Sequence, residues 1–418
     1  MSRLAAVKKT LANKDIKQLI ENFFSLAILK VFNLILPFVT LPSLIKTLGF
    51  EQYGAIVLAL ALMQYIQAVT DYGFNLSATR DIARHRHSKQ QLSFIYSKVM
   101  ASKLVLLAIS ISLILPVIFL VPQFQTDRAV FLLMLPVLIG HTLFPEWFFR
   151  GEEKMRYITV LDLSIKLFFT AGVFVFIHKP EDYWIYPLLN GVGYCVVAVV
   201  AHYLVNKHFS TSFIAVGVRQ TKTTLKNSFP LFVNQFAPNL YNNTTDFLIG
   251  LVLGNYSAGV FGAVRRVTDL LSVFNSVVIS VFYPYLNRNF KKFSVFSKLY
   301  LTFYLVFSIC FVFSLNPMFD FLGIQDNNVL TVGVLLIIGL YFRGVNNVYA
   351  TNYLVIVGKD FLVMTITTIC SLLGMVLGVM LVVNFGMLGG SINIAVIQFL
   401  LGFLAFYYYL KHKGKKLL

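Results

Sequence analysis

Two short stretches with one shared pattern decide how the sequence is organised: residues 48–54 read LGFEQYG and residues 253–259 read LGNYSAG. Gly49 and Gly254 lie 205 residues apart, close to half of the 418-residue chain. Two further pairs recur at nearly the same offset, Gly151 with Gly358 and Tyr203 with Tyr409. Because three matches at nearly one offset are unlike chance, they predict a duplicated unit.

Around these stretches the chain is strongly apolar, with 58% hydrophobic and 12% charged residues and a mean hydropathy of +0.76. A soluble domain has about 45–50% apolar and about 25% charged residues, so the composition indicates an integral membrane protein. A helix needs about 20 apolar residues to cross a bilayer. Twelve segments qualify, at residues 19–44, 53–77, 92–121, 129–149, 157–177, 183–205, 227–253, 257–286, 295–322, 329–357, 361–383 and 387–410.

The basic residues predict the orientation of these spans. The formal charge is +18, but the basic residues lie between apolar runs rather than on a soluble face, which argues against nucleic-acid binding. One set of loops and termini carries 25 Lys and Arg residues and the opposite loops carry three, so both termini are expected to be cytoplasmic. The basic N-terminus resembles a signal peptide, yet the apolar run after it is too long and lacks a cleavage site.

The expected fold is therefore all-α: a polytopic membrane protein of two six-helix lobes, residues 1–210 and 211–418. Six spans per lobe bring both repeats in from the same side, so the repeats are parallel, and such transporters place their substrate path between the halves. The three cysteines lie in apolar runs and suggest neither a disulfide framework nor a metal site, and no cofactor is expected.

Polar side chains recur within the spans at helical spacing, most clearly in residues 227–253, where Pro230 and Pro238 are expected to bend the helix. Such groups are costly in a bilayer and usually face a partner or a water-filled cavity. We therefore predict a central cavity with the headgroup-binding cations Lys30, Arg265, Arg266 and Arg343, and with Asn33, Gln64, Gln67, Asp71, Asn75, Gln235, Asn239, Asn242, Asn243, Asp246, Asp269, Asn346 and Asn347 as further polar lining.

Some intramembrane polar groups also have simpler interpretations. Asp162 and Lys166 are i, i+4 neighbours that we interpret as an intrahelical pair, and Lys103 is expected to reach a membrane surface. Asp269 could neutralise either neighbouring arginine, and packing is the favoured role of His141. The amides of residues 227–253 could serve only as interhelical hydrogen-bonding groups, although five polar groups on one face favour a lining role.

Cations without an acidic neighbour along their own helix, such as Lys30 and Arg343, suit a phosphate-bearing ligand. Arginine grips phosphate oxygens as a planar fork and lysine acts as a point charge. Amides and tyrosines suit sugar hydroxyls, and apolar helix surfaces suit a lipid tail, so the residues favour a sugar–phosphate–lipid amphiphile. The candidates for proton exchange are Asp71, Glu146, Asp246 and Asp269.

Four segments of the sequence are similar to motifs of a known family. Residues 48–54, LGFEQYG, and residues 72–83, YGFNLSATRDIA, resemble the second-span signature of the O-antigen flippases (Wzx-like polysaccharide exporters). Residues 144–155, FPEWFFRGEEKM, resemble that family's Pro-x-Trp-x-x-x-Gly-x-x-x-Met segment, with Arg150 where glutamine is expected. Residues 227–232, NSFPLF, resemble the opening of its second half.

This resemblance implies membership of the multidrug/oligosaccharidyl-lipid/polysaccharide exporter superfamily, whose two helical bundles rock around a central cavity. It implies a non-enzymatic flippase for undecaprenyl-diphosphate-linked O-antigen or related repeat units, in the inner membrane of a bacterium. Transport would run from the cytoplasmic to the periplasmic leaflet. The resemblance leaves open whether a proton or sodium gradient drives transport and whether the chain associates with polysaccharide polymerase machinery.

Three other classes of membrane protein are alternatives to this one. A cation-coupled drug or small-molecule antiporter of the same superfamily would favour carboxylates over cations in its cavity. A membrane polymerase or ligase acting on lipid-linked sugars would need a sizeable external loop, and the predicted outward loops are short. A major-facilitator carrier would show its Gly-x-x-x-Asp-Arg-x-Gly-Arg-Arg motif after span two, where this chain reads SATRDIAR at residues 77–84.

Overall fold

The computed structural model describes residues 14–288, 290–324, 326 and 328–413, and every regular element among them is helical. This confirms the predicted all-α membrane fold, while the number of twelve spans stays a prediction. Within the described part, eight helical stretches are long and apolar enough to cross a membrane: Ile35–Arg84, Lys89–Leu120, Arg128–Gly151, Met155–Phe176, Pro180–Phe209, Phe290–Phe321, Val329–Val355 and Asp360–His412.

Contacts divide the chain into two compact units. The described residues of the first unit fall within Met1–Pro37, Ile66–Phe176 and Trp184–Val233, and those of the second within Phe38–Tyr65, Ile177–Tyr183 and Asn234–Leu418. The proposed lobe boundary at residue 210 stays a prediction.

The helices follow the apolar runs of the sequence. Those within the first unit are α3 (Phe74–Arg84), α4 (Lys89–Leu120), α5 (Pro122–Gln125), α6 (Arg128–Leu133), α7 (Leu135–Leu143), α8 (Glu146–Gly151), α9 (Met155–Phe176) and α10 (Ile185–Phe209). Those within the second are α12 (Asn239–Leu253), α13 (Asn255–Arg288), η2 (Phe290–Lys292), α14 (Phe293–Phe321), α15 (Val329–Asn346), the π-helical η3 (Asn347–Val355) and α16 (Asp360–His412). Residues of both units occur in α2 (Lys14–Asp71), η1 (Pro180–Trp184) and α11 (Val218–Phe236).

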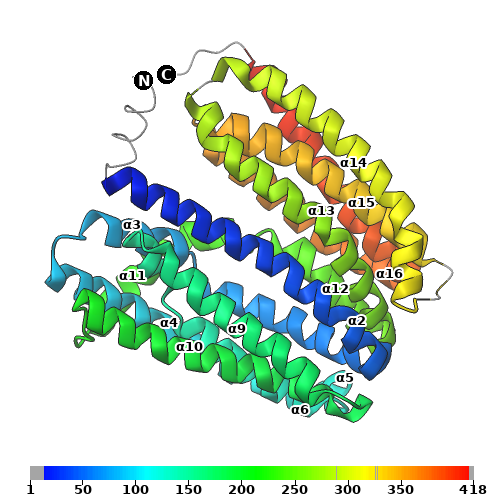
Figure 1. The fold of residues 1–418 in the computed structure, drawn as a ribbon, viewed down its shortest axis with the longest axis horizontal. Helices are drawn as coiled ribbons and strands as arrows, with labels where there is room; N and C mark the ends of the chain where they lie inside the picture. The colour runs from blue at the N-terminus through cyan, green and yellow to red at the C-terminus, as the bar shows by residue number, and fades with distance from the viewer. Residues whose placement is uncertain (1–13, 289, 325, 327, 414–418) are drawn as a thin grey trace, which may run out of the picture. The chain divides into compact units, whose positions relative to one another are not determined.

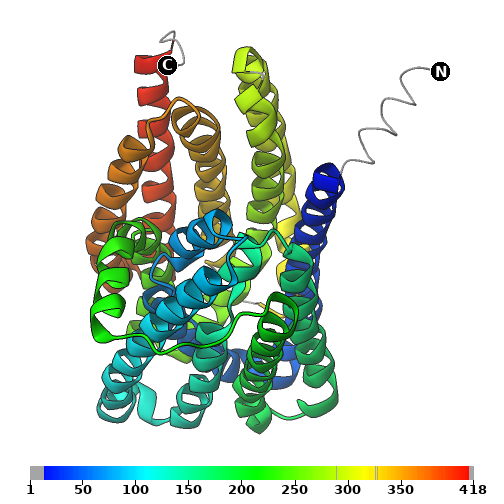
Figure 2. The ribbon, with the colours of Figure 1, turned by 90° about the vertical axis from the view of Figure 1, so that its left-hand side faces the viewer.

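In the first unit, α9 and α10 lie side by side (Figures 1 and 2), and α8 packs on α3. The α8 residues Trp147, Phe148 and Phe149 are fully buried, and Tyr96 of α4 contacts the rings of Trp147 and Phe148. Gly151 lets α8 approach α3 closely, because a Cβ there would overlap Ile82. The FPEWFFRG segment thus forms much of this unit's core.

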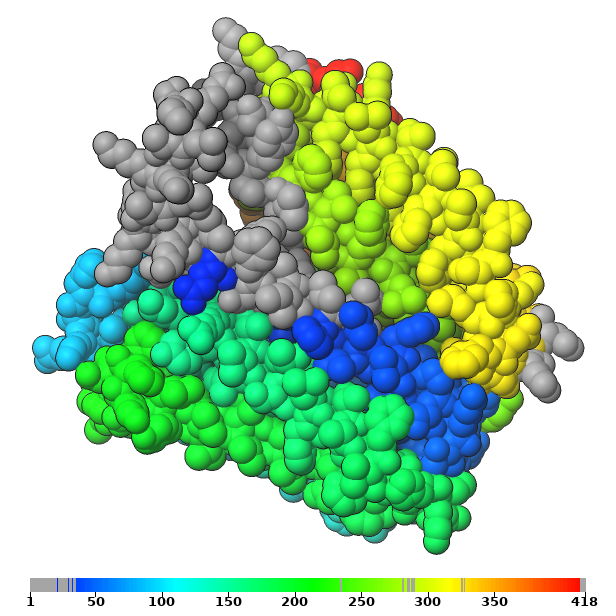
Figure 3. Space-filling view, viewed as in Figure 1, coloured from blue at the N-terminus to red at the C-terminus, as the bar shows by residue number. Residues whose placement is uncertain are grey.

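In the second unit, α16 packs against α12 and α15. The space-filling view shows α14, coloured yellow-green to yellow, at the surface of this unit (Figure 3). Its side chains Val295, Leu299 and Phe313 are 61%, 69% and 79% exposed. Such an apolar outer face suits contact with lipid chains rather than with water.

The two repeated stretches meet within the second unit. Gly49 and Gly254 share one unusual backbone conformation, with φ 77° and ψ 170° at the first and φ 85° and ψ 177° at the second. A positive φ is accessible to glycine because it has no Cβ, and here it ends one helix and starts the next. Downstream, a Cβ on Gly54 would overlap the carbonyl oxygen of Asn255, and a Cβ on Gly259 would overlap that of Phe50.

This contact is reciprocal, since Phe50 and Asn255 are also 205 residues apart. The offset recurs in the positive-φ residues Glu153 (φ 55°) and Gly358 (φ 74°). The sequence matched Gly358 with Gly151, but its structural counterpart is Glu153. The two positions share a backbone conformation with positive φ, although they do not share a residue type.

Candidate functional site

A polar pocket of about 180 Å³ lies within the second unit, between α2, α12 and α13. It brings together six of the predicted cavity residues: Gln64, Asn243, Asp246, Arg265, Arg266 and Asp269. Tyr53, Val57, Leu60 and Ala61 of α2 and Gly262 of α13 supply much of the remaining wall. Two arginines and two aspartates thus share a small space on helices that are otherwise apolar.

Arg265 is the central cation of this pocket. Its guanidinium forms an ion pair with Asp246 of α12, and its Nη1 donates a hydrogen bond to the carbonyl oxygen of Asn242 at 3.0 Å. The side chains of Arg265 and Asp246 are 19% and 18% exposed. The carboxylate that pairs with Arg265 therefore comes from the facing helix, while Asp269, one turn further along α13, interacts with Arg265 electrostatically. Whether Asp269 neutralises Arg265 or Arg266 stays a prediction.

A second, smaller pocket adjoins the first and shares Arg265 and Asp269 with it. Arg343 of α15 lines it, and this guanidinium makes no ion pair with any described residue. Gln398 of α16 also lines it and donates from Nε2 to the Tyr241 hydroxyl at 3.0 Å, while its buried Oε1 has no hydrogen-bond partner among the described residues. Arg265 thus stands between two cavities, with a further cation and an open acceptor in the second.

The polar stripe predicted for residues 227–253 is divided between two helices. α11 ends at Phe236 and α12 begins at Asn239, because Pro238 interrupts the helix there, whereas α11 continues through Pro230. The Asn239 Nδ2 donates to the Gln235 carbonyl at 3.3 Å, and the Asn243 Nδ2 donates to Asn239 Oδ1 at 3.1 Å. Of the stripe, Asn242, Asn243 and Asp246 line the two pockets, whereas Gln235 and Asn239 do not.

Three more predicted cavity residues, Gln67, Asp71 and Asn75, lie in the first unit. Lys103 of α4 donates from Nζ to Asp71 Oδ1 at 3.2 Å, and its side chain is only 2% exposed. The interpretation that Lys103 reaches a membrane surface is therefore wrong. His141 of α7 interacts electrostatically with Asp71, and its Nδ1 is buried without a hydrogen-bond partner among the described residues.

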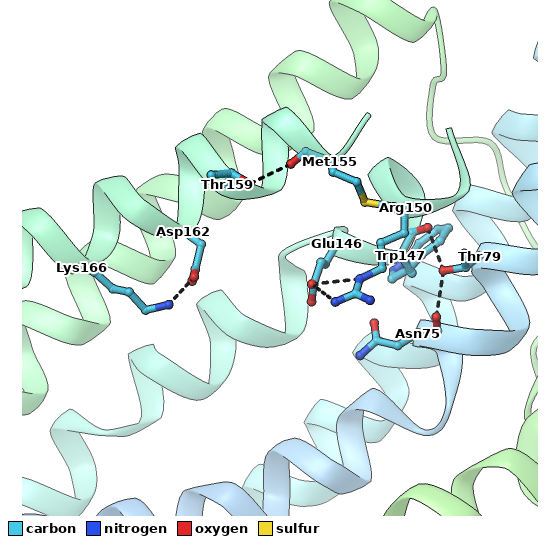
Figure 4. A network of polar contacts seen from close by, with 9 residues as sticks. All are labelled: Asn75, Thr79, Glu146, Trp147, Arg150, Met155, Thr159, Asp162 and Lys166. Carbon is cyan, nitrogen blue, oxygen red and sulfur yellow. Dashed lines mark hydrogen bonds and ion pairs between the residues drawn. The ribbon is translucent and has the colours of Figure 1, made fainter. Parts of the chain in front are cut away.

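Polar contacts join α3 to α8, and further polar contacts lie within α8 and within α9 of the first unit (Figure 4). Arg150 donates from Nε and Nη2 to Glu146 Oε1, at 3.0 and 2.6 Å, so this carboxylate already has a cation. Thr79 donates to the carbonyl oxygens of Asn75 and Trp147. The predicted pair between Asp162 and Lys166 is confirmed.

The remaining predicted residues lie elsewhere. The side chains of Lys30 and Asn33 are outside the described residues. Asn346 and Asn347 are half-buried where α15 passes into η3, and neither lines the two pockets of the second unit. Gln398 was missed from the sequence, because a single glutamine in a long apolar run has no periodic partners.

Comparisons with known proteins identify a matching family and two similar relatives. The family described as polysaccharide biosynthesis protein matches residues 19–290. A protein of Escherichia coli strain K12 named "Putative O-antigen transporter" is 27% identical over 264 residues, which are 63% of this chain and 64% of that protein. A Shigella dysenteriae protein of the same name is 24% identical over 291 residues, covering 69% and 73% of the two chains.

Two solved structures have a similar fold. Lipid II flippase MurJ in an inward closed conformation aligns with a TM-score of 0.74 and 13% identity, covering 94% of this chain and 87% of that one. An inward-facing multidrug resistance MATE family transporter of the MOP superfamily aligns with a TM-score of 0.69 and 14% identity, covering 92% and 96%. These likenesses support the predicted transporter fold.

Proposed function

Because this chain belongs to the polysaccharide biosynthesis protein family, we propose that it is a flippase for lipid-linked saccharides. The membership confirms the resemblance seen in the sequence motifs. The substrate class we favour is an undecaprenyl-diphosphate-linked O-antigen or related repeat unit, moved from the cytoplasmic to the periplasmic leaflet of a bacterial inner membrane. The names of the two relatives support this choice.

The observation that carries the proposal is the position of Arg265. Its guanidinium lies between two polar pockets within apolar helices, close to Arg266, Asp269 and Arg343. A planar, permanently charged fork in such surroundings is suited to binding phosphate oxygens bidentately. The diphosphate would bind here, while the lipid tail remains in the bilayer beside apolar helix surfaces.

In this mechanism the headgroup competes with Asp246 for Arg265. The phosphate oxygens replace the Asp246 carboxylate as the partner of the Arg265 guanidinium. Asp246, left without its cation in an apolar setting, then takes up a proton from water, because burial disfavours an unpaired carboxylate. Alternate opening of the cavity to the two sides of the membrane completes the transfer. When the headgroup leaves, Asp246 gives its proton back to water and the ion pair re-forms.

A flipping assay tests this proposal. Proteoliposomes with a fluorescent polyprenyl-diphosphate saccharide are treated with dithionite, which bleaches only the outer leaflet. The Arg265→Ala variant loses charge-assisted hydrogen bonds to the phosphate that are worth about 1.5–3 kcal/mol. It should therefore flip the saccharide about 10- to 100-fold more slowly than the wild type. Arg265→Lys should retain part of the rate, and the matched control Lys207→Ala, an exposed cation in the last turn of α10, should retain all of it.

Wild-type rates in Lys30→Ala, Arg265→Ala, Arg266→Ala and Arg343→Ala alike would discard the cationic cavity. Asp246→Asn tests the proton step separately. If release of a proton by Asp246 is needed to reset Arg265, this variant should bind the headgroup yet lose the pH dependence of flipping. A variant whose pH dependence is unchanged would contradict the coupling but leave flipping itself intact.

One observation favours a second candidate, a cation-coupled antiporter. Asp246 and Asp269 place two carboxylates in the pocket, and carboxylates suit cationic substrates or ions. The same proteoliposomes, loaded with a cationic dye under an imposed proton or sodium gradient, distinguish the two. Gradient-driven dye movement without flipping of the lipid-linked saccharide would support the antiporter.

A further inference from the structure

A pocket of about 490 Å³ lies in the first unit, between α3, α4 and α11. It shares no residue with the two pockets of the second unit. Its wall comes from three helices, and the residues that carry charge or hydrogen-bonding groups are Ser77, Arg80, Asp81, Lys98, Arg219, Gln220, Thr223, Thr224, Asn227 and Ser228. The proposed transport cavity makes no use of this pocket.

The charges of the pocket are unbalanced. Asp81 is shared by two cations, with its Oδ1 3.7 Å from Arg80 Nε and its Oδ2 3.6 Å from Lys98 Nζ. Arg219 of α11 adds a third cation and makes no ion pair with any described residue. Three cations around one carboxylate leave a positive pocket with guanidinium and ammonium donors available to an anion.

The floor of the pocket is rigid and partly polar. The hydroxyl oxygens of Ser77 on α3 and Ser228 on α11 are 2.9 Å apart and hydrogen-bonded, and both side chains are buried. Phe74 and Val99, which also line the pocket, are buried in the core of the same unit. This hydrogen bond joins α11 to α3, and Arg219 of α11 lines the same pocket as Arg80 and Lys98.

One side of the pocket is apolar and open. Phe94 of α4 lines it and is 40% exposed, and Lys98 Nζ lies 5.8 Å from the centroid of its ring. Leu76 of α3 is 49% exposed within one turn of Ser77 and Arg80. A free phosphate gains nothing from contact with apolar side chains. A lipid, in contrast, would bind the cations with its headgroup and pack its chain along Phe94 and Leu76.

We propose that this pocket binds the phosphate headgroup of a membrane lipid. The inference rests on the proposed function in one respect: it gives the lipid-linked saccharide a first docking position on the side predicted to be cytoplasmic. The same chemistry also fits the phosphodiester of an anionic phospholipid. In both cases the phosphate accepts hydrogen bonds from Arg219 and Lys98. It thereby competes with Asp81, which forms ion pairs with Arg80 and Lys98.

Binding measurements on the purified full-length protein in neutral detergent test the proposal. The probes are undecaprenyl diphosphate, phosphatidylglycerol and inorganic pyrophosphate. Arg219→Ala removes the unpaired cation, and Lys222→Ala is the matched control, because Lys222 is exposed on the same helix and does not line the pocket. Asp81→Asn removes the competing carboxylate.

Loss of one charge-assisted contact should weaken lipid binding by Arg219→Ala about tenfold. Lys222→Ala should bind as wild type, and Asp81→Asn should bind more tightly. The gain in Asp81→Asn is the decisive readout, because a merely structural role of these residues would not produce tighter binding. The Arg219 effect with undecaprenyl diphosphate alone identifies the carrier headgroup, and the effect with both lipids identifies a general anionic-lipid site.

Equal lipid affinities in all variants would overturn the inference, and so would pyrophosphate binding as tightly as the lipids. These outcomes are separate from the proposed function, which is read from flipping in the wild-type protein. A wild-type protein that binds the lipids through Arg219 but does not flip the saccharide refutes the flippase and keeps the site. If the wild-type protein flips the saccharide and all variants bind the lipids with equal affinity, the lipid site is refuted and the flippase is kept.

Discussion

Replacing Asp71 by asparagine tests how strongly the first unit depends on one ion pair. Lys103 Nζ lies 3.2 Å from Asp71 Oδ1, and the two side chains are 2% and 23% exposed. Asp71→Asn keeps the size of the side chain but leaves a buried ammonium without its counter-charge. Lys103→Met removes the other partner and fills a similar volume.

The difference in exposure sets the expected magnitudes. Removing one partner of a buried ion pair costs about 3–5 kcal/mol, because the other charge stays buried without compensation. Asp71→Asn should fall at the upper end of this range, since the ammonium of Lys103 has almost no access to water. Lys103→Met should fall at the lower end, because the Asp71 carboxylate is less deeply buried than the Lys103 ammonium. The double variant leaves no lone charge and should recover most of the loss.

The assay is equilibrium unfolding of the four proteins in the same detergent, analysed as a double-mutant cycle. Glu146→Gln provides the comparison, because Glu146 and its partner Arg150 are 29% and 41% exposed and form a pair along one helix. Breaking such a pair should cost only about 0–1 kcal/mol. The reasoning is refuted if the double variant is no more stable than the weaker single variant, or if Asp71→Asn costs no more than Glu146→Gln.

Three other predictions concern the loop after α8 and the helix crossing of the second unit. Burial raises the pKa of Glu152 above its usual 4.5, so the charged carboxylate destabilises the folded protein at pH 7. Glu152→Gln should therefore raise the unfolding temperature at pH 7. This gain should shrink as the pH falls through the raised pKa and should be gone below pH 4.5. The hydrogen bond from Arg86 lowers the pKa of Glu153, so Glu153→Gln should lower the unfolding temperature at pH 7, and the difference should disappear as the pH falls from 4.5 through the lowered pKa. An unfolding temperature whose response to pH matches the wild type would contradict either prediction. A helical Gly→Ala change usually stabilises by about 1 kcal/mol, yet Gly54→Ala should destabilise by about 1–3 kcal/mol because of overpacking, and a higher unfolding temperature would contradict it.

The sequence predicted the parts of the fold that depend on local pattern. Long apolar runs predicted the helices, and the repeated LG pairs lie at two of the places where a positive φ interrupts them, at Gly49 and Gly254. Pro238 was expected to bend its span and does separate α11 from α12. Each of these effects acts within a few residues, so a single sequence suffices to locate it.

Spacing predicted the Asp162–Lys166 pair within α9, but it could not predict ion pairs between different helices. Lys103 and Asp71 are 32 residues apart, and Arg265 pairs with a carboxylate on another helix although Asp269 lies at i+4. Helical spacing places a charge on a face, whereas the packing of the neighbouring helix decides which carboxylate is near. Of the predicted cations, Arg265 is therefore paired with a carboxylate that sequence spacing does not connect with it.

The reciprocal crossing at Gly54 and Gly259 has a consequence for how the chain tolerates substitution. A contact in which one stretch's glycine meets the other stretch's backbone, and the reverse, has the pattern that a homodimer makes about a two-fold axis. Because each glycine faces a backbone carbonyl of the other stretch, a side chain at either position meets the same obstacle, and the two positions should be equally intolerant of larger residues.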